Sequence, residues 1–256
     1  MCVSGPEAGN KATYMKQKLL LTLALSAVAL GSYAASFELT VTNHGPQPLS
    51  PLFWSAGNSN FDIFQFGQAA SLGIKNVAET GDATVLANSA LTSSDVQVSG
   101  VLGGSPLMPG QSRTVRFDAD DMHSYFSFAS MLGMTNDAFI GESVSSMGLR
   151  LFTGNVATGF SVNIYGARAW DAGTEDNTQS SSDIGAFGGS GNPADPLNLI
   201  RVHETIIPGR GDVAGQLPDW SLDTRLATVT VLPVPEPATM TVLALGAAAV
   251  LRRRKK

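Results

Sequence analysis

The stretch Ala227-Thr228-Val229-Thr230-Val231 places an apolar residue at every second position, with threonine between. Because successive side chains of a β-strand point to opposite faces, this period of two predicts a strand with one buried face and one exposed face. The same alternation occurs at Phe37–Val41 and at Phe160–Ile164. We therefore expect the chain to fold mainly as β-sheet.

Further strand-like segments have Gly, Pro, Asn or Asp close by, as strands joined by turns do. Only one segment, Gln68–Glu79, has a helical pattern, and that helix would be short. Many short strands with glycine-rich turns predict an all-β protein, a β-sandwich with long Gly/Ser-rich loops. The additional strands are expected at Val96–Leu102, Thr114–Phe117, Tyr125–Leu132 and Leu199–Ile206.

The stretch Trp170–Asn177 concentrates oxygen ligands in a turn that follows one of the alternating segments. Gly173 allows a tight turn, so the carboxylates of Asp171 and Glu175 can converge on one ion. Calcium suits such a loop, because it takes about 6 to 8 oxygen ligands in flexible geometry. The alternative is an ordinary surface turn, in which Asp bonds its own backbone and Gly takes a positive φ.

The segment Asp171–Pro196 is poor in apolar residues and rich in Ser, Gly, Asp and Asn. It predicts a long surface loop, and loops of this length are usually functional or disordered. A calcium ion at its start would order part of it.

Two ordered motifs connect the chain with a known family. The first is WDAGTE at residues 170–175, and the second is SMLGMTNDAFIG at residues 130–141. With these motifs the chain resembles the spondin N-terminal domain family. Weaker similarity covers most of the region between the two terminal segments, at residues 49–54, 61–71, 78–82 and 107–112.

The resemblance implies an antiparallel β-sandwich and calcium as the bound ion. It also implies a ligand set of Asp137, Asp171 and Glu175, because acidic residues at the matched positions bind calcium in that family. Glu175 stands where animal members have Asp, and Glu coordinates calcium through a longer arm. Animal members carry further adhesive repeats and disulfides, which this chain lacks.

The N-terminal region predicts export. Met15 and three following polar or basic residues precede LLLTLALSAVAL, which together are typical of a secretory signal peptide, and Met15 is the expected start. Small residues near Ala34 and Ala35 predict cleavage after one of them. Residues 1–35 are thus an N-terminal extension and signal peptide, and Cys2, the single cysteine, would be absent from the mature protein.

The C-terminal region, residues 234–256, predicts a second processing signal. VPEP at Val234–Pro237 precedes an apolar stretch, Ala238–Leu251, and a basic cluster, Arg252–Lys256. This order resembles the PEP-CTERM sorting tail of Gram-negative bacteria. The resemblance implies an envelope sorting protease as partner, transient or permanent membrane anchoring, and delivery to the cell surface or extracellular matrix. The alternative is a plain C-terminal anchor, whose basic end would stay in the cytoplasm.

Residues 36–233 are enough for one sizeable core, here the expected spondin-type domain. This part contains 8 Lys and Arg against 19 Asp and Glu, a net charge of −11 that the full-chain value of −5 conceals. Such an acidic domain argues against nucleic acid as a partner and is compatible with divalent cations. For most of the carboxylates, solubility outside the cell is the simpler explanation.

Motifs for catalysis do not occur: the sequence has no Gly-x-Ser-x-Gly, His-Glu-x-x-His or phosphate-binding loop. His203 and Glu204 are the one candidate acid-base pair, but neighbours on a strand point to opposite faces. Arg210-Gly211-Asp212 spells an integrin-binding tripeptide, which we interpret as a chance match.

The sequence therefore predicts an exported, non-enzymatic, calcium-binding module that serves adhesion or matrix binding, with an extracellular protein or polysaccharide matrix as partner. Two alternatives stay open. One is a structural biofilm or matrix component without a specific ligand, and the other is a hydrolase with an unrecognised site.

Overall fold

A computed structural model describes residues 33–235 of the chain. These residues belong to the second of two compact units, which begins at Tyr33. The expected signal peptide up to residue 32, Cys2, and the expected sorting tail from residue 236 lie outside the described residues.

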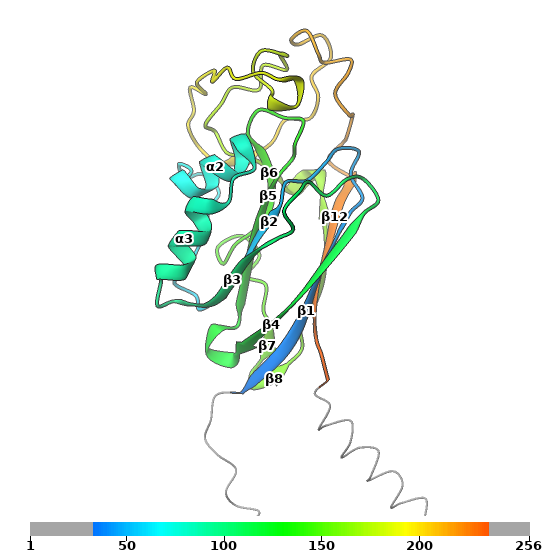
Figure 1. Cartoon of the computed structure of the whole chain (residues 1–256). Coiled ribbons are helices and arrows are strands. Elements are labelled where there is room, and N and C mark those ends of the chain that lie inside the picture. The colour runs from blue at the N-terminus through cyan, green and yellow to red at the C-terminus, as the bar shows by residue number, and fades with distance from the viewer. Residues whose placement is uncertain (1–32, 236–256) are drawn as a thin grey trace, which may run out of the picture. The chain divides into compact units, whose positions relative to one another are not determined.

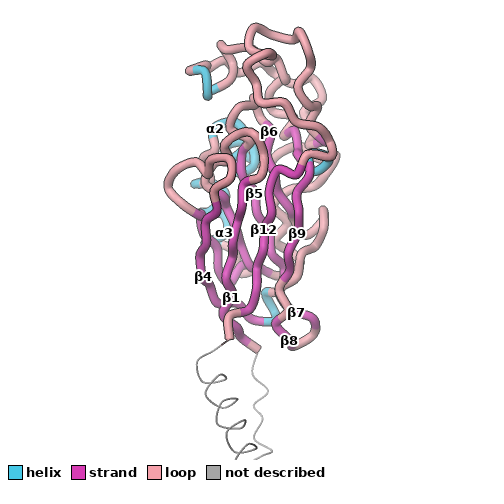
Figure 2. The backbone as a smooth tube through the Cα atoms, turned by 90° about the vertical axis from the view of Figure 1, so that its right-hand side faces the viewer, coloured by secondary structure: helices cyan, strands magenta, loops and turns pink. Residues whose placement is uncertain are grey.

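One layer of the fold is a four-stranded antiparallel sheet in the order β4-β1-β12-β9 (Figure 2). Val41 pairs with Val229, so two of the alternating stretches lie side by side at the centre of the sheet. Their apolar residues are buried and their threonines face outward, which confirms the strands expected from the period of two. The strands are β1 (Ala34–Asn43), β4 (Ser112–Asp120), β9 (Phe160–Tyr165) and β12 (Arg225–Pro233).

The second layer is a six-stranded antiparallel sheet in the order β11-β10-β6-β5-β2-β3. A small separate hairpin joins β7 (Phe152–Thr153) to β8 (Val156–Ala157). The two larger sheets pack together, and the fold is the expected all-β antiparallel sandwich (Figure 1). The six strands are β2 (Leu52–Gly57), β3 (Val96–Leu102), β5 (Tyr125–Met131), β6 (Ala138–Glu142), β10 (Ala169–Asp171) and β11 (Arg201–Val202).

The space between the sheets is filled by aromatic and aliphatic side chains. The rings of Trp54 and Phe117 lie 4.7 Å apart, and those of Phe37 and Phe152 meet edge to face at 5.3 Å. Such packing contributes about 1.5 to 3 kcal/mol for each large side chain that it buries. The main core therefore belongs to the sandwich itself.

Two helices cover the outer face of the six-stranded sheet, α2 (Leu72–Thr80) and α3 (Thr84–Thr92) (Figure 1). Helix α2 starts four residues later than the expected Gln68, because the Ser71 side chain caps it by accepting from the Ile74 N–H at 3.3 Å. A second apolar cluster joins both helices to the sheet. Single turns of 3-10 helix occur at Asp121–His123, Gly166–Arg168 and Gly185–Phe187.

Helix α3 was not expected from the sequence. Its segment contains Thr, Val, Ser and Asn, which are weak helix formers. Leu86 and Ala90, four residues apart, are its buried residues, and this burial against α2 and the sheet outweighs the weak propensity.

The expected strand at Leu199–Ile206 is wrong in extent, since only β11, Arg201–Val202, pairs there. Strands β6 and β10 were not expected either. Every residue of both strands is buried, so the alternation that reveals a half-exposed strand is missing from them.

The loops that follow β10 and β11, residues 172–200 and 203–217, gather at one end of the sandwich, and we call them the cap (Figure 1). The cap contains no strand, as expected for the long loop, but it is not only surface. Ile184, Val213 and Leu217 form a third, small apolar cluster. No helix within residues 33–235 is long and apolar enough to cross a membrane.

Candidate metal centre

The sandwich places two of the expected ligands next to each other. Asp171 is the last residue of β10 and pairs with Ala138, the first residue of β6. Asp137 directly precedes β6, and its carbonyl oxygen accepts from the Ala172 N–H at 3.1 Å. Two motifs far apart in the sequence thus meet because their strands are neighbours.

The third expected ligand joins them through the turn after β10. Gly173 has a φ of +69°, and a Cβ there would lie 2.5 Å from the backbone of Leu199, so the turn requires glycine. The turn wraps around Asp137, whose Oδ2 accepts from the backbone N–H groups of Thr174 and Glu175 at 2.8 and 2.9 Å. The structure therefore brings Asp137, Asp171 and Glu175 together.

All three carboxyl groups are withdrawn from water. Asp137 and Asp171 are fully buried, and Glu175 is 5% exposed. Burial, followed by the charge of Asp137, raises the pKa of Asp171 to about 7. Burial, followed by the charges of Glu79 and Asp137, raises the pKa of Glu175 to about 8. Burial also raises the pKa of Asp137. The cluster lacks positive charge for the number of carboxylates it holds.

Arg201 supplies part of that charge. Its guanidinium donates to Asp171 Oδ2 at 2.8 Å and to Asp195 Oδ2 at 2.5 Å. The other Asp171 oxygen accepts from the Gly173 N–H at 2.7 Å. Both oxygens of Asp171 thus accept a hydrogen bond from the protein.

Several polar atoms beside the cluster have no hydrogen-bond partner although they are buried. They include Asp137 Oδ1, both amide atoms of Asn136, and Glu79 Oε1. A buried polar atom without a partner costs about 1 to 3 kcal/mol, so such atoms usually mark an unfilled interaction. Oxygen atoms are the ligands that calcium prefers, and the available donors fit that ion.

The cluster is not already arranged as a closed metal site. Across residues 33–235, no three acidic, histidine or cysteine side chains converge closely enough to hold a metal ion. An ion would have to draw the carboxylates together by changing side-chain rotamers.

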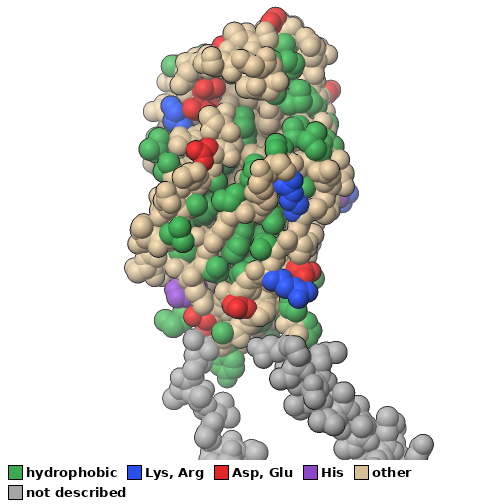
Figure 3. Space-filling model, viewed as in Figure 1, with side chains coloured by type: hydrophobic (Ala, Val, Ile, Leu, Met, Phe, Trp, Pro, Cys, Tyr) green, Lys and Arg blue, Asp and Glu red, His purple; other side chains and the backbone are tan. Residues whose placement is uncertain are grey.

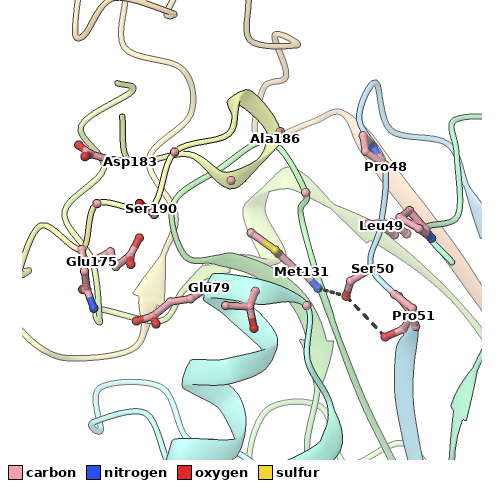
Figure 4. Close-up of a pocket in the computed structure, with 18 residues that line it drawn as sticks. Pro48, Leu49, Ser50, Pro51, Glu79, Met131, Glu175, Asp183, Ala186 and Ser190 are labelled. Carbon is pink, nitrogen blue, oxygen red and sulfur yellow. Dashed lines mark hydrogen bonds between the residues drawn. The ribbon is translucent and has the colours of Figure 1, made fainter. Parts of the chain in front are cut away.

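A pocket of about 740 Å³ opens beside the cluster, between the cap, the end of α2 and the segment that precedes β2 (Figure 4). Glu79 and Glu175 face each other at one end, and Pro48, Leu49 and Pro51 form the other. Met131 lies between the two ends. Glu175 thus lines the pocket, whereas Asp137 and Asp171 lie behind it in the protein.

The sequence did not point to Asn136 or Glu79. Asn136 is 2% exposed and adjoins Asp137, and its amide lowers the pKa of Glu175 in opposition to burial. The only signal for either residue was its position within a motif, residues 130–141 for Asn136 and residues 78–82 for Glu79.

The candidate acid-base pair is separated by the fold. His203 is 2% exposed and stacks on Trp220 at 5.6 Å, while Glu204 is exposed. Burial lowers the pKa of His203 to about 4, so it is neutral at physiological pH. The fold thus encloses the imidazole and leaves the Glu204 side chain in solvent.

The residues of the Arg210-Gly211-Asp212 tripeptide link parts of the cap. Arg210 pairs with Asp176 at 3.1 Å, and Asp212 accepts from the Ser181 N–H at 2.7 Å. The charged side chains of the tripeptide thus hold parts of the cap together.

The face shown in Figure 3 carries isolated acidic and basic side chains and no continuous basic patch among the described residues.

Comparison with known proteins gave two family matches. A family model described as Spondin_N matches residues 40–187, and one described as PEP-CTERM protein-sorting motif matches residues 233–255. No curated protein matches the chain significantly. The sorting motif indicates export and sorting to the cell envelope of a Gram-negative bacterium, with recognition by an envelope sorting system and membrane anchoring. Neither matched family is enzymatic.

Proposed function

This chain belongs to the Spondin_N family, and from that premise we propose that it is a calcium-binding, non-enzymatic module that attaches the cell surface to an extracellular protein or polysaccharide matrix. The observation that carries the proposal is the buried trio Asp137, Asp171 and Glu175, which comes from two strand ends and one cap turn and lacks positive charge.

The calcium ion would be held by these three residues and would supply the missing charge. Asp137 would contribute Oδ1, its oxygen without a partner, while Oδ2 keeps its bonds to the turn. Asp171 would stay oriented by Arg201, which donates to its Oδ2 at 2.8 Å. The ion would thus join the turn before β6 to the first turn of the cap.

Such a site suits an exported protein. Extracellular modules bind calcium at about 10⁻⁴ to 10⁻³ M, which matches the calcium available outside cells. A hundredfold excess over Kd would stabilise the fold by about 2.7 kcal/mol. The cap would then be ordered only outside the cell, where its partner is.

Thermal unfolding of the purified protein with calcium and with chelator tests the metal. We expect calcium to raise the Tm by about 5 to 10 °C. Asp137→Asn and Asp171→Asn should abolish this rise, while Glu38→Gln, a matched change at an ion pair on the sandwich surface, should keep it. If the Tm of the unaltered protein is the same with calcium and with chelator, the site is ruled out.

Adsorption of the purified protein to matrix polysaccharide and matrix protein, with calcium and with chelator, tests the attachment role. Calcium-dependent adsorption that Asp171→Asn removes would support it. Sedimentation of the protein with itself, without any adsorption, would instead favour a structural matrix component.

A further inference from the structure

Glu79 is a buried carboxylate outside the trio that the family resemblance indicated. It lies in the last turn of α2, and its side chain is 11% exposed. Its Oε1 has no hydrogen-bond partner, and its one ion pair is with Lys75, at a Nζ–Oε1 distance of 3.4 Å. Figure 4 shows the Glu79 carboxylate directed across the pocket toward Glu175.

The fold holds Glu79 in that place. Ile74, Val77 and Ala78, on the buried side of α2, are fully buried in the second apolar cluster, so the helix cannot turn about its axis. Gly81 ends the helix in a left-handed conformation, and a Cβ there would lie 2.7 Å from the Ser50 Cβ. The end of α2 therefore packs directly against the sandwich, and Glu79 is fixed beside the cap.

The turn between β5 and β6 also carries buried polar atoms that have no hydrogen-bond partner. The turn between β5 and β6 contributes Asp137 Oδ1 and the Asn136 amide, all without partners and both residues at most 2% exposed. Glu175 connects the two places, because its N–H donates to Asp137 Oδ2 at 2.9 Å and its side chain lines the same pocket as Glu79. Oxygen atoms from three segments, the end of α2, the turn before β6 and the turn after β10, thus lie near Glu175.

We propose that Glu79 is a fourth carboxylate ligand of the calcium ion, and that Lys75 is the partner that Glu79 releases when the ion binds. This inference rests on the calcium site proposed above. Calcium needs about 6 to 8 oxygen atoms, and the trio alone does not supply them unless its carboxylates bind through both oxygens. Glu79, the Asn136 oxygen and water from the pocket complete the set.

Lys75 then acts as a built-in competitor. In the calcium-free protein its ammonium group is the nearest positive charge to Glu79, and it lowers the pKa of Glu175 as well. Calcium has to displace this weak, half-exposed ion pair, in which the Lys75 side chain is 37% exposed. Removing the lysine should strengthen calcium binding, whereas removing the carboxylate should weaken it.

Calcium titration by calorimetry separates these effects. We expect Glu79→Gln to raise the Kd about tenfold and Lys75→Met to lower it severalfold, because a carboxylate ligand and a competing cation act in opposite directions. Glu38→Gln is the matched control and should leave the Kd unchanged. Far-UV circular dichroism without calcium should be the same for all variants, since Glu79→Gln keeps the shape of the side chain.

Luminescence lifetimes of bound terbium in H₂O and D₂O show whether Glu79 touches the ion. If it is a ligand, Glu79→Ala, which removes both oxygen atoms of the side chain, should add about one water molecule to the terbium shell. A weaker Kd with an unchanged water number would mean that Glu79 acts through its charge alone, and would overturn the ligand assignment.

The outcomes distinguish this inference from the site on which it rests. If Asp137→Asn and Asp171→Asn abolish calcium binding while Glu79→Gln changes nothing, Glu79 is not a ligand and the three-residue site stands. If none of these variants matters, the calcium site itself is wrong. An unchanged Kd in Lys75→Met would mean that Lys75 does not compete with calcium for Glu79.

Discussion

In the sandwich, the ring of Phe37 is fully buried between Phe117 and Phe152, whereas in the cap a polar side chain, the amide of Gln179, is fully buried. Gln179 Oε1 accepts from the Ile207 N–H at 2.6 Å, and Nε2 donates to the carbonyl oxygens of Ile207 and Arg210 at 2.7 and 2.9 Å. The sandwich is stabilised mainly by apolar burial, and the cap mainly by specific polar contacts.

This difference determines how each region responds to damage and to solution conditions. Apolar packing is spread over many neighbours and is insensitive to pH and to ions. Polar and ionic contacts depend on a few atoms and on their protonation. The sandwich should therefore set global stability, and the cap should respond to calcium and pH.

The largest expected effect is on the sandwich. Phe37→Ala should destabilise the protein by about 3 to 5 kcal/mol, because it leaves a cavity between the two sheets. Urea unfolding with calcium present measures this change. The Tm increment produced by calcium should persist in the variant, and its loss would mean that core and cap are not separable.

The next effect is a pH dependence that comes from the cap. Glu175 and Asp171 have folded-state pKa values of about 8 and about 7, above their ordinary values of 4.5 and 3.8. At these two groups the folded state therefore holds more protons, so their contribution to stability is full below about pH 4 and falls as the pH rises to about 8. After allowance for solvent near the pocket, the loss in the calcium-free protein should be about 2 kcal/mol.

Thermal unfolding across this pH range, in chelator and in calcium, measures that dependence. Glu175→Gln should flatten the curve in chelator, because it removes the group with the higher pKa. Calcium should also flatten it, since the ion binds the deprotonated carboxylates and binds better as the pH rises. A Tm in chelator that increases from pH 5 to pH 8 would contradict the burial of these acids.

The smallest effect should be confined to the cap. Gln179→Ala removes three hydrogen bonds and should cost about 1 to 3 kcal/mol in local stability. Hydrogen exchange should become faster in residues 172–217 and stay unchanged in β1 and β12. Equal acceleration in the strands would show that cap and sandwich unfold as one unit.

The two regions also differ in how far the sequence predicts them. The strands around Val41 and Val229 were predictable, because burial of one face leaves a period of two. Strands β6 and β10, buried throughout, leave no such period. Helix α3 depends on packing against α2, and the contacts of Gln179 join residues that are distant in sequence. The local sequence around helix α3 and around Gln179 therefore does not predict these contacts.

The residues of the candidate site also differ in how far the sequence predicts them. Asp171 and Glu175 share one glycine turn, so loop chemistry alone indicated them. Asp137 came only from the family resemblance, because its proximity depends on the pairing of β6 with β10. Glu79 and Asn136 were missed, since the role proposed for them follows from unsatisfied atoms that only the folded chain reveals.

The pairing of β1 with β12 has a mechanical consequence. Phe37 pairs with Pro233, and the Val234 N–H donates to the Ser36 carbonyl oxygen at 2.8 Å, so the sorting tail leaves the domain from a central strand. The cap lies at the opposite end of the sandwich (Figure 1). A pull between an anchored tail and a partner held at the cap runs along the strands. It loads the rungs of the β1–β12 and β12–β9 ladders together in shear, rather than opening them one after another as in a zipper.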